Sequence, residues 1–463
     1  MSHEHRGDDA SDEISVNPLF ARRAESAIPR WRIPDDEMLP ETAYQIIHDE
    51  LLLDGNARQN LATFVTTWME PQATRLYAEA FDKNLVDKDE YPQTAAIEER
   101  CLHVLADLWN ASDPHATVGT SAMGSSEACM LAGLVFKRRW QIARRAAGKS
   151  TASPNIVFSS AVQVVWEKFA NYWEVEPRYV PITKEQPYLT VAGMLSAIDE
   201  NTIGVVAVLG VTYNGVYEPV KELADALDDL ETRRGLDVPL HVDAASGGFI
   251  APFLDPDLEW DFRVSRVHSI SASGHKFGLV YPGVGWILWA KREYLPEELI
   301  FNVSYLGGDM PTLGLNFSRP GAQVLLQYYN FLRLGREGYR RVMQASKDAA
   351  RYLATELSKM NNFEVLTDGT DMPLVSWTTD NHNRPWDLHD LSAKLRERGW
   401  QVPAYPMPAD IQDLTVMRVV FRNGVSIDLT RLLVADITAS IQFLDARSGP
   451  TRPAVTPTAP FHH

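Results

Sequence analysis

Cysteine, positive charge and long apolar runs are all scarce in this chain, and each scarcity excludes a class of protein. Two cysteines among 463 residues, Cys101 and Cys129, cannot build a disulfide framework or a cysteine-rich metal site. No apolar run approaches the roughly 18 residues that span a bilayer, so we expect no stable membrane insertion. A net charge of -17 argues against a nucleic-acid partner, because phosphate binding needs a basic surface. The zinc spacing His-Glu-x-x-His is absent too, and we predict no metal.

The two ends of the chain differ in composition from its middle. The opening MSHEHRGDDASDEIS lacks the apolar core of a signal peptide, which predicts a cytoplasmic location. The acidic residues between Asp8 and Glu13 indicate either a mobile terminus or a segment that orders when its carboxylates are protonated. The stretch from Gly449 to Pro460 is rich in Pro and Thr, which predicts no regular structure.

The middle of the chain alternates helical patterns with short apolar strands, which predicts an α/β fold with a mainly parallel sheet flanked by helices. The expected strands are Ile156–Phe158, Ile203–Val211, Val238–Val242 and Gly285–Trp289, and the expected helices are Thr42–Leu53 and Glu218–Arg234. Beyond about Arg340 the order helix, strand, helix, strand predicts a smaller C-terminal α/β domain, built from Tyr339–Met360, Leu374–Thr378, Leu388–Arg398 and Val416–Phe421.

A chain of this length needs more than one core, and composition divides it into four parts. We expect an N-terminal segment with oligomer contacts (1–58), a large domain (59–345), a small domain (346–448) and a flexible tail (449–463).

Lys276 is the first candidate for chemistry. It lies in SASGHKFG (271–278), a segment too polar and too glycine-rich to be a core element. A lysine becomes a Schiff-base nucleophile when a buried site and a neighbouring cation lower its pKa, and His275 is adjacent. Most lysines are solvated surface charges, so the pair alone is weak evidence.

Two further motifs strengthen the case. Asp243 ends an apolar strand, where it needs a cationic partner such as a pyridinium nitrogen, unless it only caps the next turn. Gly124 to Ala128 (GSSEA) opens a helix whose N-terminus, with Ser125 and Ser126, suits a phosphate, although ordinary capping would look the same. Strand ends and helix starts are where open α/β sheets bind ligands, so the three motifs together indicate one site.

These motifs resemble those of the glutamate decarboxylases, in the bacterial and plant branch of the fold-type-I pyridoxal-phosphate enzymes. The matching stretches are DGNARQNLATF (54–64), GSSEA (124–128), GVTY (210–213), HVDAASGGF (241–249), SASGHKFG (271–278) and NFSRP (316–320). The resemblance covers nearly the whole chain and is weakest before Pro40 and in the tail.

The resemblance implies a role for each matching position. Lys276 would carry pyridoxal 5'-phosphate as a Schiff base, and Asp243 would pair with the ring nitrogen. The phosphate would contact Ser125, Ser126, Ser273 and His275, while Gln163, Thr212 and Ala245 would lie around the ring. Thr63, Phe64, Asn84 and Asp87 would surround the distal carboxylate of the substrate, Arg422 would hold its α-carboxylate, and Phe317 and Ser318 would come from a neighbouring subunit.

The activity implied is conversion of L-glutamate to 4-aminobutyrate and CO2 by a homodimer or homohexamer. Because the reaction consumes a proton, it could serve acid resistance. Two alternatives stay open: a decarboxylase of another amino acid, aspartate or aromatic, and a cofactor-binding homologue without catalysis. No Trp- and Lys-rich calmodulin-binding extension is present.

The tail suggests a pH gate. Bacterial relatives end with a histidine that plugs the site near neutral pH and leaves when it protonates. His462 or His463 could act in this way, although the proline-rich tail departs from those relatives in sequence. Alternatively, both could be the remnant of a purification tag. The pH–activity profile of a chain that ends at Pro460 tests the hypothesis.

Overall fold

A computed structural model describes residues 31–304, 310–379 and 384–446. The chain forms two compact units, Met1–Asn56 and Ala57–His463. The first contains helix α1 (Pro40–Leu51), which begins two residues before the predicted start and buries none of its side chains. The acidic start and the proline-rich tail lie outside the described residues.

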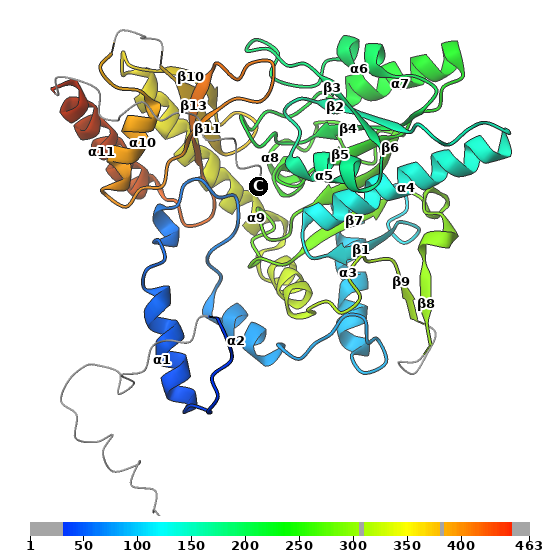
Figure 1. Cartoon of the computed structure of the whole chain (residues 1–463), viewed down its shortest axis with the longest axis horizontal. Helices are drawn as coiled ribbons and strands as arrows, with labels where there is room; N and C mark the ends of the chain where they lie inside the picture. Colours follow the sequence, from blue (N-terminus) through cyan, green and yellow to red (C-terminus); the bar gives the residue numbers. More distant parts are fainter. Residues whose placement is uncertain (1–30, 305–309, 380–383, 447–463) are drawn as a thin grey trace, which may run out of the picture. The chain divides into compact units, whose positions relative to one another are not determined.

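A seven-stranded sheet forms the centre of the second unit (Figure 1). Its order is β1-β7-β6-β5-β4-β2-β3. Strands β3, β2, β4, β5 and β6 run parallel, whereas β7 is antiparallel to both β6 and β1, so the prediction of a mainly parallel sheet is confirmed. The strands are β1 (Val118–Ala122), β2 (Asn155–Ser159), β3 (Glu176–Val180), β4 (Thr202–Val208), β5 (Leu240–Asp243), β6 (Val267–Ala272) and β7 (Gly285–Trp289).

Hydrophobic cores lie on both faces of this sheet. Along β4, Val205 and Ala207 pack into one core while Val206 and Val208 pack into the other, which explains the unbroken apolar run in the sequence. The predicted strand to Val211 is three residues too long, because Gly210 has a φ of 97° and the chain turns there. The helices here are α2 (Pro71–Glu79), α3 (Pro92–Leu108), α4 (Ser125–Ala146), α5 (Val164–Tyr172), α6 (Val191–Ala197), α7 (Val220–Arg234) and α8 (Ala251–Leu254).

A smaller antiparallel sheet, β10-β11-β13-β12, has a core of its own (Figure 1). Helix α9 (Ala322–Ser358) begins 17 residues before the predicted Tyr339 and is interrupted at Gly335, where φ is 57°. The predicted boundary at 345 therefore falls inside a helix. The other elements are β10 (Glu364–Asp368), β11 (Leu374–Thr378), β12 (Ala404–Pro406), β13 (Thr415–Val420), α10 (Leu388–Arg396), α11 (Ile427–Asp445) and the hairpin β8 (Phe301–Val303) with β9 (Met310–Thr312).

None of the helices within the described ranges is long and apolar enough to cross a membrane.

Glu218 is a buried carboxyl group that lies beside the end of β4. Its side chain is 2% exposed and accepts hydrogen bonds from the backbone N–H groups of Val208, at 2.7 Å, and Leu189, at 2.8 Å. Burial raises its pKa from 4.5 to about 7 despite these donors, because the charged form loses its hydration. The folded chain therefore favours the neutral carboxyl group.

We predict that Glu218→Gln removes one part of the pH dependence of stability. In the wild type this carboxyl group contributes fully below about pH 4.5, and the contribution is lost as the pH rises through 7. At about 1.4 kcal/mol for each pKa unit, the loss is about 3 kcal/mol. The check is the free energy of unfolding in urea from pH 4.5 to 8, with the exposed Glu222→Gln on α7 as control. A wild-type slope in the Glu218→Gln variant would contradict the prediction.

Candidate active site

A cavity of about 300 Å³ lies where the carboxyl ends of β4 and β5 meet the N-terminus of α4. Open α/β sheets bind their ligands at this edge. Eight of the predicted cofactor residues line it: Ser125, Ser126, Gln163, Thr212, Asp243, Ala245, His275 and Lys276. The motifs that the sequence separates by more than a hundred residues are therefore brought together.

Lys276 points its amino group into this cavity. Nζ donates to Ser246 Oγ at 3.4 Å and lies 5.5 Å from the centre of the Phe64 ring. Burial lowers the pKa of Lys276 below 10.5, and the negative charge of Asp243 opposes that shift. A lower pKa makes the neutral, nucleophilic amine more accessible, as covalent chemistry at a lysine requires.

Asp243 is held from two sides. The Ala245 N–H donates to Oδ1 at 3.2 Å and the Trp166 indole N–H donates to Oδ2 at 2.9 Å. Beside it on β5, His241 is fully buried between the hydroxyl groups of Ser269 and Ser271, at 2.8 and 3.1 Å. Burial lowers the pKa of His241 to about 3, so this imidazole stays neutral.

The start of α4, with Ser125, Ser126 and the adjacent His275, is called the cradle here. A Cβ on Gly285 would come within 2.6 Å of the Ser125 nitrogen, and a Cβ on Gly124 would come within 2.9 Å of the His275 ring, so both positions admit no side chain without movement. Ser273 Oγ and His275 Nδ1 are buried without a hydrogen-bond partner. Burial, followed by the charge of Lys276, lowers the pKa of His275 to about 4.

Thr63 and Phe64, two of the predicted substrate residues, lie beside Lys276. The chain at Thr66 ties them there, since its N–H donates to the His275 carbonyl at 2.8 Å and its hydroxyl to the Lys276 carbonyl at 2.7 Å. The Phe64 ring packs edge-on against Phe277, with centroids 6.5 Å apart.

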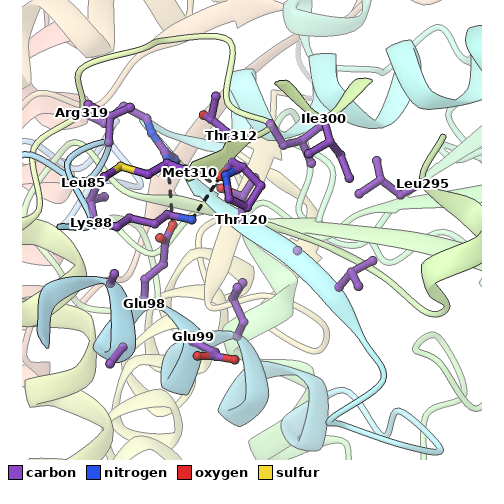
Figure 2. Close-up of a pocket in the computed structure, with 18 of the residues that line it drawn as sticks. Leu85, Lys88, Glu98, Glu99, Thr120, Leu295, Ile300, Met310, Thr312 and Arg319 are labelled. Atoms are coloured by element: carbon purple, nitrogen blue, oxygen red, sulfur yellow. Dashed lines mark hydrogen bonds and ion pairs between the residues drawn. The ribbon is translucent and has the colours of Figure 1, made fainter. Parts of the chain in front are cut away.

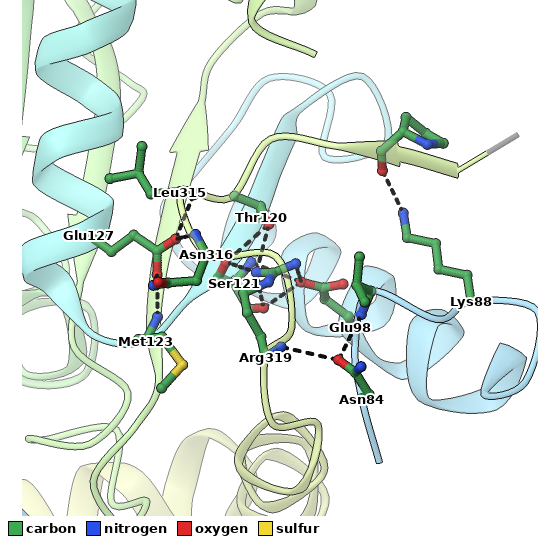
Figure 3. A network of polar contacts seen from close by, with 12 residues as sticks. Asn84, Lys88, Glu98, Thr120, Ser121, Met123, Glu127, Leu315, Asn316 and Arg319 are labelled. Carbon is green, nitrogen blue, oxygen red and sulfur yellow. Dashed lines mark hydrogen bonds and ion pairs between the residues drawn. The ribbon is translucent and has the colours of Figure 1, made fainter. Parts of the chain in front are cut away.

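Asn84, another predicted substrate residue, belongs to a different cluster, where it lies beside Arg319 (Figure 3). Asn84 donates to Ser318 Oγ at 3.3 Å and accepts from the Arg319 N–H at 3.1 Å. Asp87 accepts from the Glu90 N–H at 3.1 Å. A cavity of about 570 Å³ adjoins this cluster and is lined by Glu98 and Arg319 among other residues (Figure 2). Phe317 is 41% exposed.

Glu127 connects the two regions. It lies in the first turn of α4 and lines the Lys276 cavity, while its carboxylate accepts from the N–H of Met123 and of Leu315, both at 2.8 Å. Figure 3 shows it between the start of α4 and the Leu315–Asn316 segment. The segment that carries Phe317 and Ser318 is thus attached to the cradle by one buried carboxylate.

Arg422 is buried rather than a surface charge, but it does not line the Lys276 cavity. It donates to the carbonyl groups of Ala57 and Asn60, and its Nε is buried without a partner. Arg418 lies closer to the lysine: its guanidinium stacks 4.8 Å from the Phe64 ring centre, it donates to the Thr212 carbonyl, and its charge lowers the pKa of Lys276.

Four residues of this site were not predicted: Ser246, Trp166, Glu127 and Arg418. Ser246 and Glu127 lie inside the recognised motifs, which could have indicated them. Trp166 and Arg418 carry no local signal, because only the fold brings them close to Asp243 and Lys276. His462 and His463 lie outside the described residues. Within the described part of the chain, no three His, Cys, Asp or Glu side chains are grouped to hold a metal ion.

The comparisons with known proteins agree with this geometry. Residues 34–379 match the pyridoxal-dependent decarboxylase conserved domain, which is most of the chain. The chain belongs to the pyridoxal-dependent decarboxylase family. It is 53% identical to the glutamate decarboxylase of Aliivibrio fischeri over 90% of each chain. The solved glutamate decarboxylase of Lactobacillus brevis is 43% identical, with a TM-score of 0.91 over 94% of this chain and 99% of that one. A sphingosine-1-phosphate lyase of Burkholderia pseudomallei, 20% identical with a TM-score of 0.76, shares the fold.

The cofactor of this decarboxylase family, pyridoxal phosphate, fits the residues present. Its phosphate needs donors at a helix N-terminus, and the His275 ring, with its Nδ1 unpartnered, packs against Gly124 at the start of α4. Its ring nitrogen needs a carboxylate, and the Asp243 carboxylate lies in the lining of the cavity. Its aldehyde needs an amine, and the Lys276 amine lies in the same cavity.

We predict opposite effects of Ser273→Ala on the apoprotein and on cofactor binding. An unsatisfied buried hydroxyl group stabilises nothing, so its removal should leave the apoprotein equally stable or more stable, by up to about 1 kcal/mol. If the hydroxyl group contacts the phosphate, the dissociation constant for pyridoxal phosphate should rise about tenfold, the equivalent of about 1.4 kcal/mol.

Thermal unfolding of the apoprotein and a fluorescence titration with the cofactor measure the two effects. Ser271→Ala is the matched control, since its hydroxyl group is bonded to His241 and its loss should destabilise the apoprotein. Unchanged cofactor affinity in the Ser273→Ala variant would show that the Ser273 hydroxyl group does not contact the phosphate.

Proposed function

We propose that this decarboxylase converts L-glutamate to 4-aminobutyrate and CO2, with Lys276 as the residue that attaches the cofactor. The observation that carries the proposal is the meeting of Lys276, Asp243 and the α4 N-terminus in one cavity. The identity to glutamate decarboxylases over nine tenths of the chain supports the choice of substrate. The reaction takes up one proton for each CO2 released.

Different side chains of the protein bind the cofactor and exchange with the substrate. Pyridoxal phosphate supplies an electron sink for the pair left when the Cα–carboxylate bond breaks. The Asp243 carboxylate favours a protonated ring nitrogen, which keeps that sink effective. The Lys276 amine, kept less basic by burial, is in place to exchange with the substrate's amino group and to return when the product leaves. Ser125 and Ser126 bind the phosphate at the helix N-terminus.

Two groups of residues bind the substrate's carboxylates in this proposal. Thr63 and Phe64 are held beside Lys276, where they can contact the bound amino acid. Arg422 holds the α-carboxylate: its buried Nε lacks a partner, and a planar guanidinium suits a carboxylate. Its bonds to Ala57 and Asn60 also attach it to the segment that leads to Thr63.

Asn84, Asp87, Phe317 and Ser318 complete the site of a neighbouring copy. The polar network of Asn84 and Ser318 lies in a cluster that does not line the Lys276 cavity of its own chain. The active assembly is therefore a homodimer at least, in which each chain supplies the cofactor site of one centre and part of the substrate pocket of the other.

We predict that the wild type forms 4-aminobutyrate from L-glutamate with added pyridoxal phosphate at pH about 4.5 to 5, and that Lys276→Ala forms none. That pH is near the ordinary side-chain pKa of glutamate, about 4.3. Lys221→Ala, an exposed lysine on α7, should keep wild-type activity. L-aspartate and L-tyrosine serve as alternative substrates in the same assay. If either one is turned over faster than L-glutamate, that amino acid is the substrate and the proposed choice of glutamate is wrong.

A second prediction concerns the shared site. Ser318→Ala and Lys276→Ala chains, each weak or inactive alone, should regain activity when they are co-expressed. In a mixed dimer one of the two centres has both residues intact, so random pairing gives about a quarter of the wild-type activity. Activity no greater than the sum of the two parents would show that Ser318 acts on its own chain or not at all.

A further inference from the structure

Trp166 lies directly behind the carboxylate that faces the cofactor. It is fully buried, and its indole Nε1 donates to Asp243 Oδ2 at 2.9 Å, while Ala245 holds Oδ1 at 3.2 Å. Each carboxylate oxygen thus accepts from one N–H group, and the buried Cys129 thiol also interacts with this carboxylate. Two donors on different oxygens fix both the position and the plane of a carboxylate.

The indole side of this bond is surrounded by closely packed aromatic side chains. The Trp166 ring packs against Phe169 and His241, with centroids 6.0 and 5.3 Å away, inside the core beneath the sheet. Asp243 itself is 3% exposed. Because Trp166 is fully buried, loss of the indole N–H would leave Asp243 Oδ2 without this donor.

Helix α5 places the indole relative to the cavity. Gln163 caps the helix, since its Oε1 accepts from the Val165 N–H at 2.7 Å, and both residues line the cavity. Trp166 follows in the same turn and points to Asp243. One short helix therefore fixes the cavity wall and the support of the carboxylate together.

We propose that Trp166 is a positioning residue for Asp243: its indole N–H holds the carboxylate in the orientation that binds the protonated ring nitrogen of the cofactor. The proposal rests on the proposed function only for the identity of the cofactor. It concerns how strongly the ring proton is held, and glutamate need not be the substrate.

Trp289 provides a matched control. It is fully buried in the same core, on β7, but its indole Nε1 has no hydrogen-bond partner. Trp166→Phe and Trp289→Phe therefore remove similar ring volume from one core, and only the first removes a donor from Asp243.

The test compares both variants with the wild type as holoenzymes. For Trp166→Phe we expect the dissociation constant of pyridoxal phosphate to rise about tenfold, as loss of a hydrogen bond to a charged group implies. The visible absorption of the bound cofactor should change at a lower pH, because its ring proton is held less firmly. With glutamate, kcat should fall about tenfold while KM stays within twofold. Trp289→Phe should stay within twofold of the wild type in each measurement.

Equal cofactor affinity and equal spectral titration in the two variants would overturn the proposal. If Trp166→Phe fails to fold, 3-benzothienylalanine at position 166 keeps the shape and lacks only the N–H; wild-type affinity and spectrum in that variant would overturn it as well. If the wild type does not turn over glutamate, the proposed function is wrong, but the proposal for Trp166 is still tested. The cofactor affinity and the cofactor spectrum are both measured without substrate.

Discussion

The meeting of an amine and a carboxylate in one poorly hydrated cavity is the constraint on which the rest of the site depends. Burial lowers the pKa of Lys276, and the negative charge of Asp243 opposes that fall. Both must also stay far enough apart for a flat ring to bind between them. The strand end at Asp243, the loop at Lys276 and the start of α4 satisfy this, because parallel strands bring their carboxyl ends to a common edge.

Satisfying buried polar atoms explains many of the supporting residues. Asp243 receives donors from Ala245 and Trp166, and Glu127 receives backbone donors from the chain on both sides of it. Ser273 and His275 are among the residues that keep a buried polar atom without a partner, as Trp289 and Arg422 also do. Only where such an atom lies beside a cavity, as His275 does, does it indicate a place for a ligand.

The sequence predicted the parts of the site that lie in continuous motifs. Apolar runs identify β4 and β5, so the sequence alone was enough to place Asp243 at a strand end. Arg418 and Trp166 were not predicted, because their contacts with Thr212 and Asp243 join segments that lie far apart in the sequence. The error at Val211 has a local cause, since hydrophobicity cannot reveal that Gly210 turns with a positive φ. The predicted start of α9 at Tyr339 missed the part of the helix that precedes Gly335, the residue at which the helical backbone is interrupted.

The two imidazoles near the cofactor site have pKa values that determine how little they contribute to proton uptake. His241 and His275 hold pKa values of about 3 and 4, so neither binds a proton between pH 5 and 8. The interior beside Asp243 and Lys276 thus has no histidine buffer in the range where histidine normally titrates. Glu218, whose pKa burial raises to about 7, is therefore a buried group that takes up a proton in that range, whereas His241 and His275 stay neutral as the pH falls through it.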